Sequence, residues 1–200
     1  MEVIESEIKK IIEGLLFATD RPLSIADIIK FLGETSGLDK KQIASIIENI
    51  NHDYDDRGVE LKETASGYRF QVRDKLAPWI SKLWEERPPR YSKALLETLA
   101  LIAYRQPITR GEIEEVRGVS VSSNIIRTLE ERDWVKVVGH KDVPGRPALY
   151  VTTNKFLDYF NLKNLKELPT LSDARDINEV AEQVELELGL CEVDEDGAVD

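Results

Sequence analysis

The side chains that most often carry catalysis or bind metal are few and widely spaced in this chain. It has two histidines, His52 and His140, and one cysteine, Cys191. A zinc site needs three or four ligands close together, and nucleophilic catalysis needs a nucleophile beside a base. The adjacent carboxylates at 114–115 and 130–131 fall on expected helix surfaces, where solvation is the simpler interpretation. We therefore expect no catalytic residues, no metal site and no cofactor.

One loop carries cationic side chains in a setting that suits binding. Residues 139–148 read Gly-His-Lys-Asp-Val-Pro-Gly-Arg-Pro-Ala, which places Lys141 and Arg146 on either side of a Pro-Gly turn. In one interpretation both side chains face a phosphate or an acidic partner. In the other, the turn only closes a hairpin. The residues alone leave both interpretations open.

An internal repeat with an offset of 85 residues gives this loop its structural context. Five positions of the first copy recur in the second, as Ala18/Ala103, Pro22/Pro107, Leu23/Ile108, Ser24/Thr109 and Gly33/Gly118. Each copy predicts an apolar helix, a break at proline, a Ser or Thr N-cap, a short helix and a stop at glycine.

Each copy continues with a third helix and a hairpin. Asp39 in the first copy and Ser122 or Ser123 in the second are expected to cap the third helix. Alternating apolar and polar residues predict paired strands at 59–62 with 68–72 and at 135–138 with 148–152. Three helices followed by a two-stranded wing are the winged-helix plan. The predicted fold class is mainly α with small β-hairpins (α+β), arranged as two tandem winged-helix domains.

Prolines divide the chain into domains. The Arg-Pro-Pro-Arg sequence at 87–90 cannot continue a helix and marks a boundary. We expect a first domain at 1–87, with an extra helix at 75–86 packed on its hairpin. A second domain at 88–170 ends in a short closing helix. Residues 171–200 are expected to form an acidic tail, partly helical and then disordered.

Most of the net charge of −11 belongs to that tail. Residues 173–200 hold 11 acidic side chains and one basic side chain, so the remaining 172 residues sum to −1. A DNA-binding domain normally shows a basic face, whereas residues 88–172 carry only +3. This balance favours a protein partner. Apolar runs of only a few residues and a single cysteine lead us to expect a cytoplasmic protein without a membrane span.

The third helix of the second copy keeps an alternative function open. It starts with small polar residues at 120–124 and carries Arg127, and such side chains can read base edges. Acidic residues at 130–133 follow and would repel phosphate. The alternative is a DNA-binding winged-helix transcription regulator that reads DNA through residues 39–52 and 122–132.

The first helix carries an apolar stripe that includes Ile4, Ile8 and Ile11. All three residues can belong to the core of a single domain. A small domain can also bury such a surface against a second copy of itself. We favour the second interpretation and expect these three residues to contribute to dimerisation.

Three segments of the second half closely resemble the segregation and condensation protein B family. They are Tyr-Ser-Lys-Ala-Leu-Leu-Glu-Thr-Leu-Ala-Leu-Ile-Ala-Tyr-Arg-Gln-Pro-Ile-Thr-Arg-Gly-Glu-Ile at 91–113, Val-Gly-His-Lys-Asp-Val-Pro-Gly-Arg-Pro-Ala-Leu-Tyr at 138–150, and the segment 156–169. The likeness extends over about residues 1–170. Val151 departs from it, because a small residue is expected after the tyrosine.

The resemblance implies a non-catalytic subunit of a prokaryotic SMC–kleisin complex that acts in chromosome condensation and partition during the cell cycle and cell division. It implies a homodimer joined through the N-terminal domain. The partners it implies are the kleisin subunit (segregation and condensation protein A) and, through the kleisin, the SMC ATPase. Contact with DNA would be indirect or weak, at the nucleoid. For kleisin contacts we expect exposed positions of the second copy, including Trp134, Arg146 and Pro147.

Overall fold

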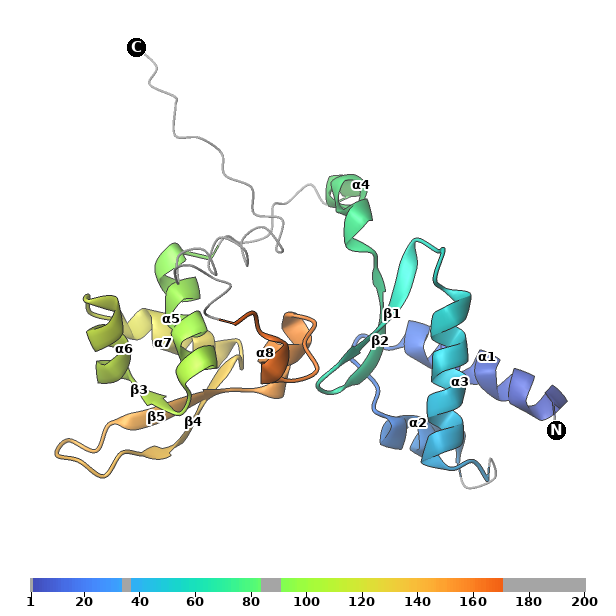
Figure 1. Cartoon of the computed structure of the whole chain (residues 1–200), viewed down its shortest axis with the longest axis horizontal. Coiled ribbons are helices and arrows are strands. Elements are labelled where there is room, and N and C mark those ends of the chain that lie inside the picture. Colours follow the sequence, from blue (N-terminus) through green and yellow to red (C-terminus); the bar gives the residue numbers. More distant parts are fainter. Residues whose placement is uncertain (1, 34–36, 84–90, 171–200) are drawn as a thin grey trace, which may run out of the picture. The chain divides into compact units, whose positions relative to one another are not determined.

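The computed structural model describes residues 2–33, 37–83 and 91–170, and the chain divides into two compact units (Figure 1). The first unit is Met1–Glu85 together with Asn154–Leu168, and the second is Glu86–Thr153 together with Pro169–Asp200. This differs from the expected second domain at 88–170, because residues 154–168 belong to the first unit. The tail expected at 171–200 lies outside the described residues.

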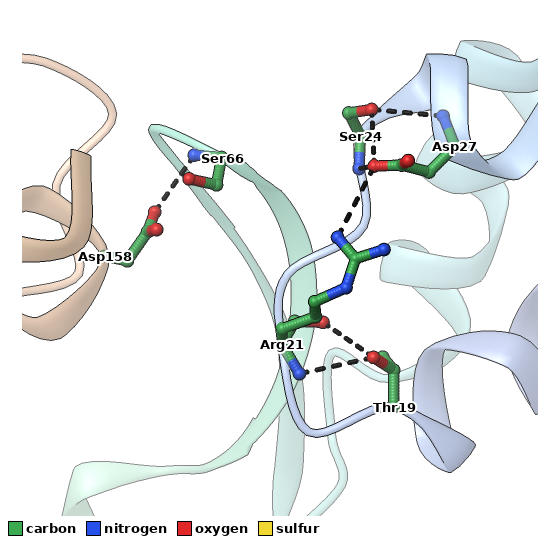
Figure 2. Close-up of polar contacts among 6 residues, drawn as sticks. All are labelled: Thr19, Arg21, Ser24, Asp27, Ser66 and Asp158. Atoms are coloured by element: carbon green, nitrogen blue, oxygen red, sulfur yellow. Dashed lines mark hydrogen bonds and ion pairs between the residues drawn. The ribbon is translucent and has the colours of Figure 1, made fainter.

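The first unit has three helices followed by a hairpin. Its elements are α1 (Glu2–Ala18), α2 (Ile25–Leu32), α3 (Lys40–Asp53), β1 (Val59–Thr64), β2 (Gly67–Val72), η2 (Asp74–Leu76), α4 (Ala77–Ile80), η3 (Ser81–Leu83), α8 (Asn154–Tyr159) and η4 (Leu165–Glu167). Ser24 and Asp39 cap α2 and α3 as predicted, each through a reciprocal capping box. Figure 2 shows the first of these boxes, in which the Ser24 hydroxyl accepts from the N–H of Asp27.

The core of the first unit lies between its three helices and the hairpin. Ile8, Ile12 and Leu16 follow one another at the four-residue spacing of a single face of α1, and they are at most 7% exposed. The whole buried cluster consists of Ile8, Ile12, Leu16, Leu23, Ile28, Ile43, Ile46, Ile47, Ile50, Tyr54 and Leu61.

A one-residue bridge joins the loop before α2 to the hairpin. Leu23 and Tyr68 exchange two backbone hydrogen bonds of 2.9 Å each, and this pairing adds a third strand position beside β2. Gly67 precedes Tyr68 with a φ of +140°, and a Cβ built on it would lie 2.2 Å from the carbonyl oxygen of Leu23. Only glycine permits this close approach of two backbone segments.

The extra helix expected at 75–86 is broken into short helical pieces over the described residues 74–83. The segment forms two short 3-10 turns around the four-residue helix α4, and Pro78 lies in the first turn of α4, where its missing N–H leaves no helix bond unmade. Trp79 and Leu83 are 64% and 70% exposed, so they do not pack on the hairpin as expected. Residues 84–86 lie outside the described residues.

The second unit repeats the plan of the first. Its elements are α5 (Lys93–Arg105), β3 (Ile108–Thr109), α6 (Arg110–Arg117), α7 (Ser123–Glu131), β4 (Val135–His140) and β5 (Ala148–Thr152). Thr109 forms the capping box of α6, Gly118 ends that helix with a φ of +69°, and Ser122 caps α7. These caps and both hairpins confirm the repeat and the predicted winged-helix fold.

Sequence reasoning missed the third strand of the second sheet. Its order is β3-β5-β4, and Ile108 lies opposite Tyr150. Two residues are too short a segment to show alternation. The structure therefore has in both units a bridge at equivalent positions, Leu23 and Ile108. Within the described residues no helix is both long and apolar enough to cross a membrane.

The bridge predicts that Gly67→Ala destabilises the protein by about 3 kcal/mol, because the added methyl group forces the Leu23 and Tyr68 backbones apart. Urea unfolding of the full chain measures the loss. Gly14→Ala is the matched control: a Cβ there meets no atom within 4 Å, and alanine in a helix interior is expected to add about 0.5 to 1 kcal/mol. Equal stability of the two variants would contradict the role of Gly67.

Candidate partner-binding surfaces

The two histidines lie in different units, His52 in the first and His140 in the second. His52 Nδ1 lies 2.9 Å from Oδ2 of Asp55 in an exposed pair, and His140 is exposed on β4. Cys191 lies outside the described residues. Within the ranges that the structure describes, no three His, Cys, Asp or Glu residues gather as a metal-binding group.

The loop between β4 and β5 forms a closed turn. Of its two cations, Lys141 and Arg146, Lys141 forms an ion pair with its own unit. Lys141 Nζ lies 2.6 Å from Oε1 of Glu112, at the start of α6. Inside the loop, the N–H of Lys141 donates to the carbonyl of Pro147, and the N–H of Arg146 donates to that of Val143. Lys141 therefore connects the wing to the capping box of α6 in its own unit.

Two neighbouring residues, Thr109 and Lys141, stabilise the charge of Glu112. Its other carboxylate oxygen accepts from the backbone N–H and the hydroxyl of Thr109, at 2.8 Å each. The Lys141 ammonium and these Thr109 bonds lower the pKa of Glu112 from 4.5 to about 2. Its negative charge thus holds both the start of the helix and the wing.

Arg146 and Pro147 meet the geometric requirement for partner contact. Arg146 is exposed, with a φ of +38° that turns the chain after Gly145, and Pro147 is half-buried. Among the described residues Arg146 has no ion-pair partner. The loop therefore presents one uncommitted guanidinium beside a rigid proline.

Trp134 does not meet that requirement, and the expectation that it is exposed is wrong. It is 2% exposed and lies immediately before β4. Its ring lies 5.2 Å from that of Tyr91, and the Arg132 guanidinium lies over both rings at 5.4 and 4.6 Å. Its indole belongs to the core of the second unit.

Most cations around α6 and α7 are paired with carboxylates of their own unit. Arg127 pairs with Glu131 at 2.7 Å along the exposed side of α7. Arg117, only 9% exposed, pairs with Glu97 of α5 at 2.7 Å. Because these charges are neutralised locally, the helices do not present a row of free cations.

Glu114 corrects the expectation that the adjacent carboxylates are merely solvated. One of its oxygens accepts from the N–H of Val121 at 2.8 Å and from Nε of Arg110 at 3.0 Å. The bond from Val121 and then Arg110 lower the pKa of this carboxyl. Glu114 thereby fixes the turn between α6 and α7, while its neighbour Glu115 is exposed.

The three isoleucines expected to contribute to dimerisation have different environments. Ile8 is 7% exposed and belongs to the core of its own unit, which corrects its assignment to a second copy. Ile11 is 50% exposed. The side chain of Ile4 lies outside the described residues. Ile11 is thus an exposed apolar residue of the stripe on α1.

Sequence reasoning missed an exposed aromatic at the end of α1. Phe17 is 52% exposed and stacks on Phe70 of β2, with ring centroids 4.0 Å apart and an interplanar angle of 12°. Tyr54 lies beside both rings, and its hydroxyl donates to Glu13. The pairing joins residues more than 50 positions apart, which no local pattern reveals.

These surfaces define a protein of two tandem winged-helix units whose cations mostly hold its own elements together. The chain belongs to the family described as segregation and condensation complex subunit ScpB, whose model matches residues 10–171. It is 53% identical to a segregation and condensation protein B homolog of Coxiella burnetii over 182 residues, covering 91% of this chain and 87% of the relative. It is 39% identical to segregation and condensation protein B of Syntrophotalea carbinolica, covering 89% of each chain.

Two solved structures are also similar to the chain. One is ScpB from Mycobacterium tuberculosis, at 30% identity and a TM-score of 0.36, covering 79% of this chain and 97% of the other. The second is a dimer of an ScpB N-terminal domain complexed with a ScpA peptide, at 28% identity and a TM-score of 0.35. The match covers 40% of this chain and 96% of the other.

The lowered pKa of Glu112 predicts a specific pH dependence of stability. The unfolded carboxyl binds its proton near pH 4.5, well above the folded value of about 2. The stabilisation is therefore present above about pH 4.5 and is lost as the pH falls toward 2. Glu112→Gln keeps the capping acceptor without the charge. Urea unfolding should show that the free energy of unfolding of Glu112→Gln is lower than that of the unaltered chain. This difference should be constant around neutral pH and should shrink below about pH 4.5.

Glu115→Gln is the control, because it removes the same charge from an exposed position of α6. The difference in free energy of unfolding between Glu115→Gln and the unaltered chain should not shrink as the pH falls. If the loss of unfolding free energy caused by Glu112→Gln stays constant down to about pH 3, the assigned role of the carboxylate is contradicted.

Proposed function

We propose that this chain is a non-catalytic subunit of a prokaryotic SMC–kleisin complex that acts in chromosome condensation and segregation, where it binds the kleisin subunit as a homodimer. The proposal is supported by similarity over nearly the whole chain to proteins whose names describe segregation and condensation. The SMC ATPase is reached through the kleisin and supplies the ATP hydrolysis. Such a subunit works in the cytoplasm at the nucleoid.

The observation that carries binding to a protein, in preference to DNA, is the local pairing of cations in the second unit. A DNA-reading helix presents free Lys and Arg side chains to phosphates. Here Arg127 of α7 is paired with Glu131, and Lys141 of the wing is paired with Glu112. These two elements would enter or flank the groove, and each has one cation already paired with a carboxylate of its own unit. This favours the kleisin-binding function over the transcription regulator.

The proposed kleisin contact is the wing loop of the second unit, through Arg146 and Pro147. Arg146 can pair with a carboxylate of the partner, and guanidinium groups are common among residues that dominate binding energy. Val143, 40% exposed in the same loop, adds apolar area. The proposed dimer contact is on the first unit, where Ile11 and Phe17 are each about half exposed.

The wing-loop contact predicts that Arg146→Ala weakens kleisin binding by about tenfold, because it removes the uncommitted cation of the loop. Affinity can be measured by calorimetry with the full chain and the purified kleisin subunit. Lys136→Ala, at an exposed position of β4 outside the loop, is the matched control. Equal affinities of the two variants would refute the assignment of the loop.

The same purified chain separates the proposed function from its alternative. A chain that holds no kleisin at moderate salt but shifts duplex DNA at low salt, with a steep salt dependence, would be a DNA-binding regulator. The proposal expects stable co-purification with the kleisin and at most weak DNA binding.

The dimer contact predicts that Ile11→Asp weakens self-association by about tenfold or more, because it buries a charge in an apolar interface. Sedimentation equilibrium of the full chain measures the dimer dissociation constant. Ser6→Asp adds the same charge to α1 at another exposed position and should have little effect. A dimer unaffected by Ile11→Asp would place the interface elsewhere.

A further inference from the structure

The tip of the first hairpin is occupied by a distant segment of its own chain. The turn between β1 and β2 has two backbone N–H groups that point away from the hairpin. That of Ser66 donates to Oδ1 of Asp158 at 2.9 Å, and that of Ala65 donates to the carbonyl of Leu162 at 3.0 Å. Figure 2 shows Asp158, on the α8 segment, facing the Ser66 N–H. Turn amides that are usually solvated thus have partners about 90 residues away in the sequence.

Two side chains of the hairpin extend this contact on either side of the turn. Nη2 of Arg69 donates to the carbonyl of Asp158 at 3.0 Å and to Oδ1 of Asn161 at 2.6 Å. Nζ of Lys163 lies 2.5 Å from Oε2 of Glu63. The exposed pair contributes little by itself. The half-buried Arg69 contacts add directional bonds to the two turn amides.

The segment that binds has a shape fixed by its own backbone. The N–H of Leu162 donates to the carbonyl of Leu157 at 2.8 Å, and that of Asn161 donates to the carbonyl of Asp158 at 3.3 Å. Asn161 has a φ of +57°. This pattern is a Schellman turn, which ends helix α8 and directs the next residues back along it. A preformed turn loses little conformational entropy when it binds.

We propose that residues 157–163, here called the latch, are a built-in ligand of the first wing. The wing is a peptide-binding surface that takes a turn with an Asp carboxylate and an Asn amide, and the latch closes it. The two wings therefore differ in use: the first is occupied by its own chain, and the second exposes Arg146. A partner that needs the first wing must displace the latch. This inference does not depend on the proposed function.

Amide hydrogen exchange of the full chain, resolved by NMR, tests the latch. The Ser66 and Ala65 amides should exchange slowly although they lie in a turn. Asp158→Ala removes the charged acceptor and should accelerate Ser66 exchange by about tenfold or more. Asn161→Gly suits the positive φ and keeps the Schellman turn, but it removes one of the two acceptors of Arg69. It should therefore accelerate the exchange of both amides to a smaller extent.

Lys155→Ala is the matched control, because it alters an exposed side chain of α8 outside the latch. It should leave the exchange rates of the Ser66 and Ala65 amides unchanged. Fast exchange of Ser66 and Ala65 in the unaltered chain, or no response to Asp158→Ala and Asn161→Gly, would overturn the proposal.

A mixing experiment identifies the chain that supplies the latch. Isotope-labelled Asp158→Ala protein is refolded together with an excess of the unlabelled, unaltered chain. Ser66 of the labelled chain should remain unprotected, because its own latch lacks the carboxylate. Recovery of protection would show that the latch of a second copy occupies the wing, which would overturn the assignment to the same chain.

Discussion

Each winged-helix unit depends on backbone pairing between the residue after its proline and the second strand of its hairpin. Leu23 pairs with Tyr68, and Ile108 pairs with Tyr150. The next residue is the N-cap of the short helix in both units, so the pairing fixes where that helix starts relative to the hairpin. Both apolar side chains are at most 4% exposed, so the same residue also joins the core. Sheet and helices are thus held together by one position.

Two carboxylates of the second unit, Glu112 and Glu114, hold its helices and wing in place. Glu112 holds the cap of α6 and the wing lysine, and Glu114 holds the turn that leads to α7. Each carboxylate accepts from a backbone N–H and a cation together, so its charge stabilises two elements. An electrically balanced unit of this kind is suited to recognising a protein segment by shape and a few exposed groups, such as Arg146. It is poorly suited to following a polyanion.

The sequence predicted those parts of the fold that depend on local rules. The capping residues Ser24, Asp39 and Thr109 and the stop at Gly118 were predictable, because a cap acts on backbone groups only a few positions away. The burial of Trp134 was not, since an aromatic residue before a strand can face either side. The pairing of Asp158 with Ser66 was equally hidden, because a charged residue in a sequence gives no indication of which distant amide it will meet.

Part of the candidate partner-binding surface could also be predicted from local sequence motifs. The Pro-Gly turn and its flanking cations indicated an exposed loop, and Arg146 fits that expectation. That Lys141 would be held by Glu112 depends on how the wing folds back toward α6, which is a matter of tertiary structure. The apolar stripe of α1 was visible in the sequence. Its division into buried Ile8 and exposed Ile11 follows only from where α3 and the hairpin pack.

The discontinuous first unit has a consequence for synthesis on the ribosome. Helices α1 to α4 and the hairpin have emerged by residue 83, whereas Asp158, the acceptor for the Ser66 amide, lies 75 residues further on. At common elongation rates that interval is roughly 4 to 15 s. Residues 86–153 of the second unit emerge within it and have time to fold. The nascent chain therefore spends several seconds with one finished wing still bare, a period in which a chaperone or an early partner has access to it.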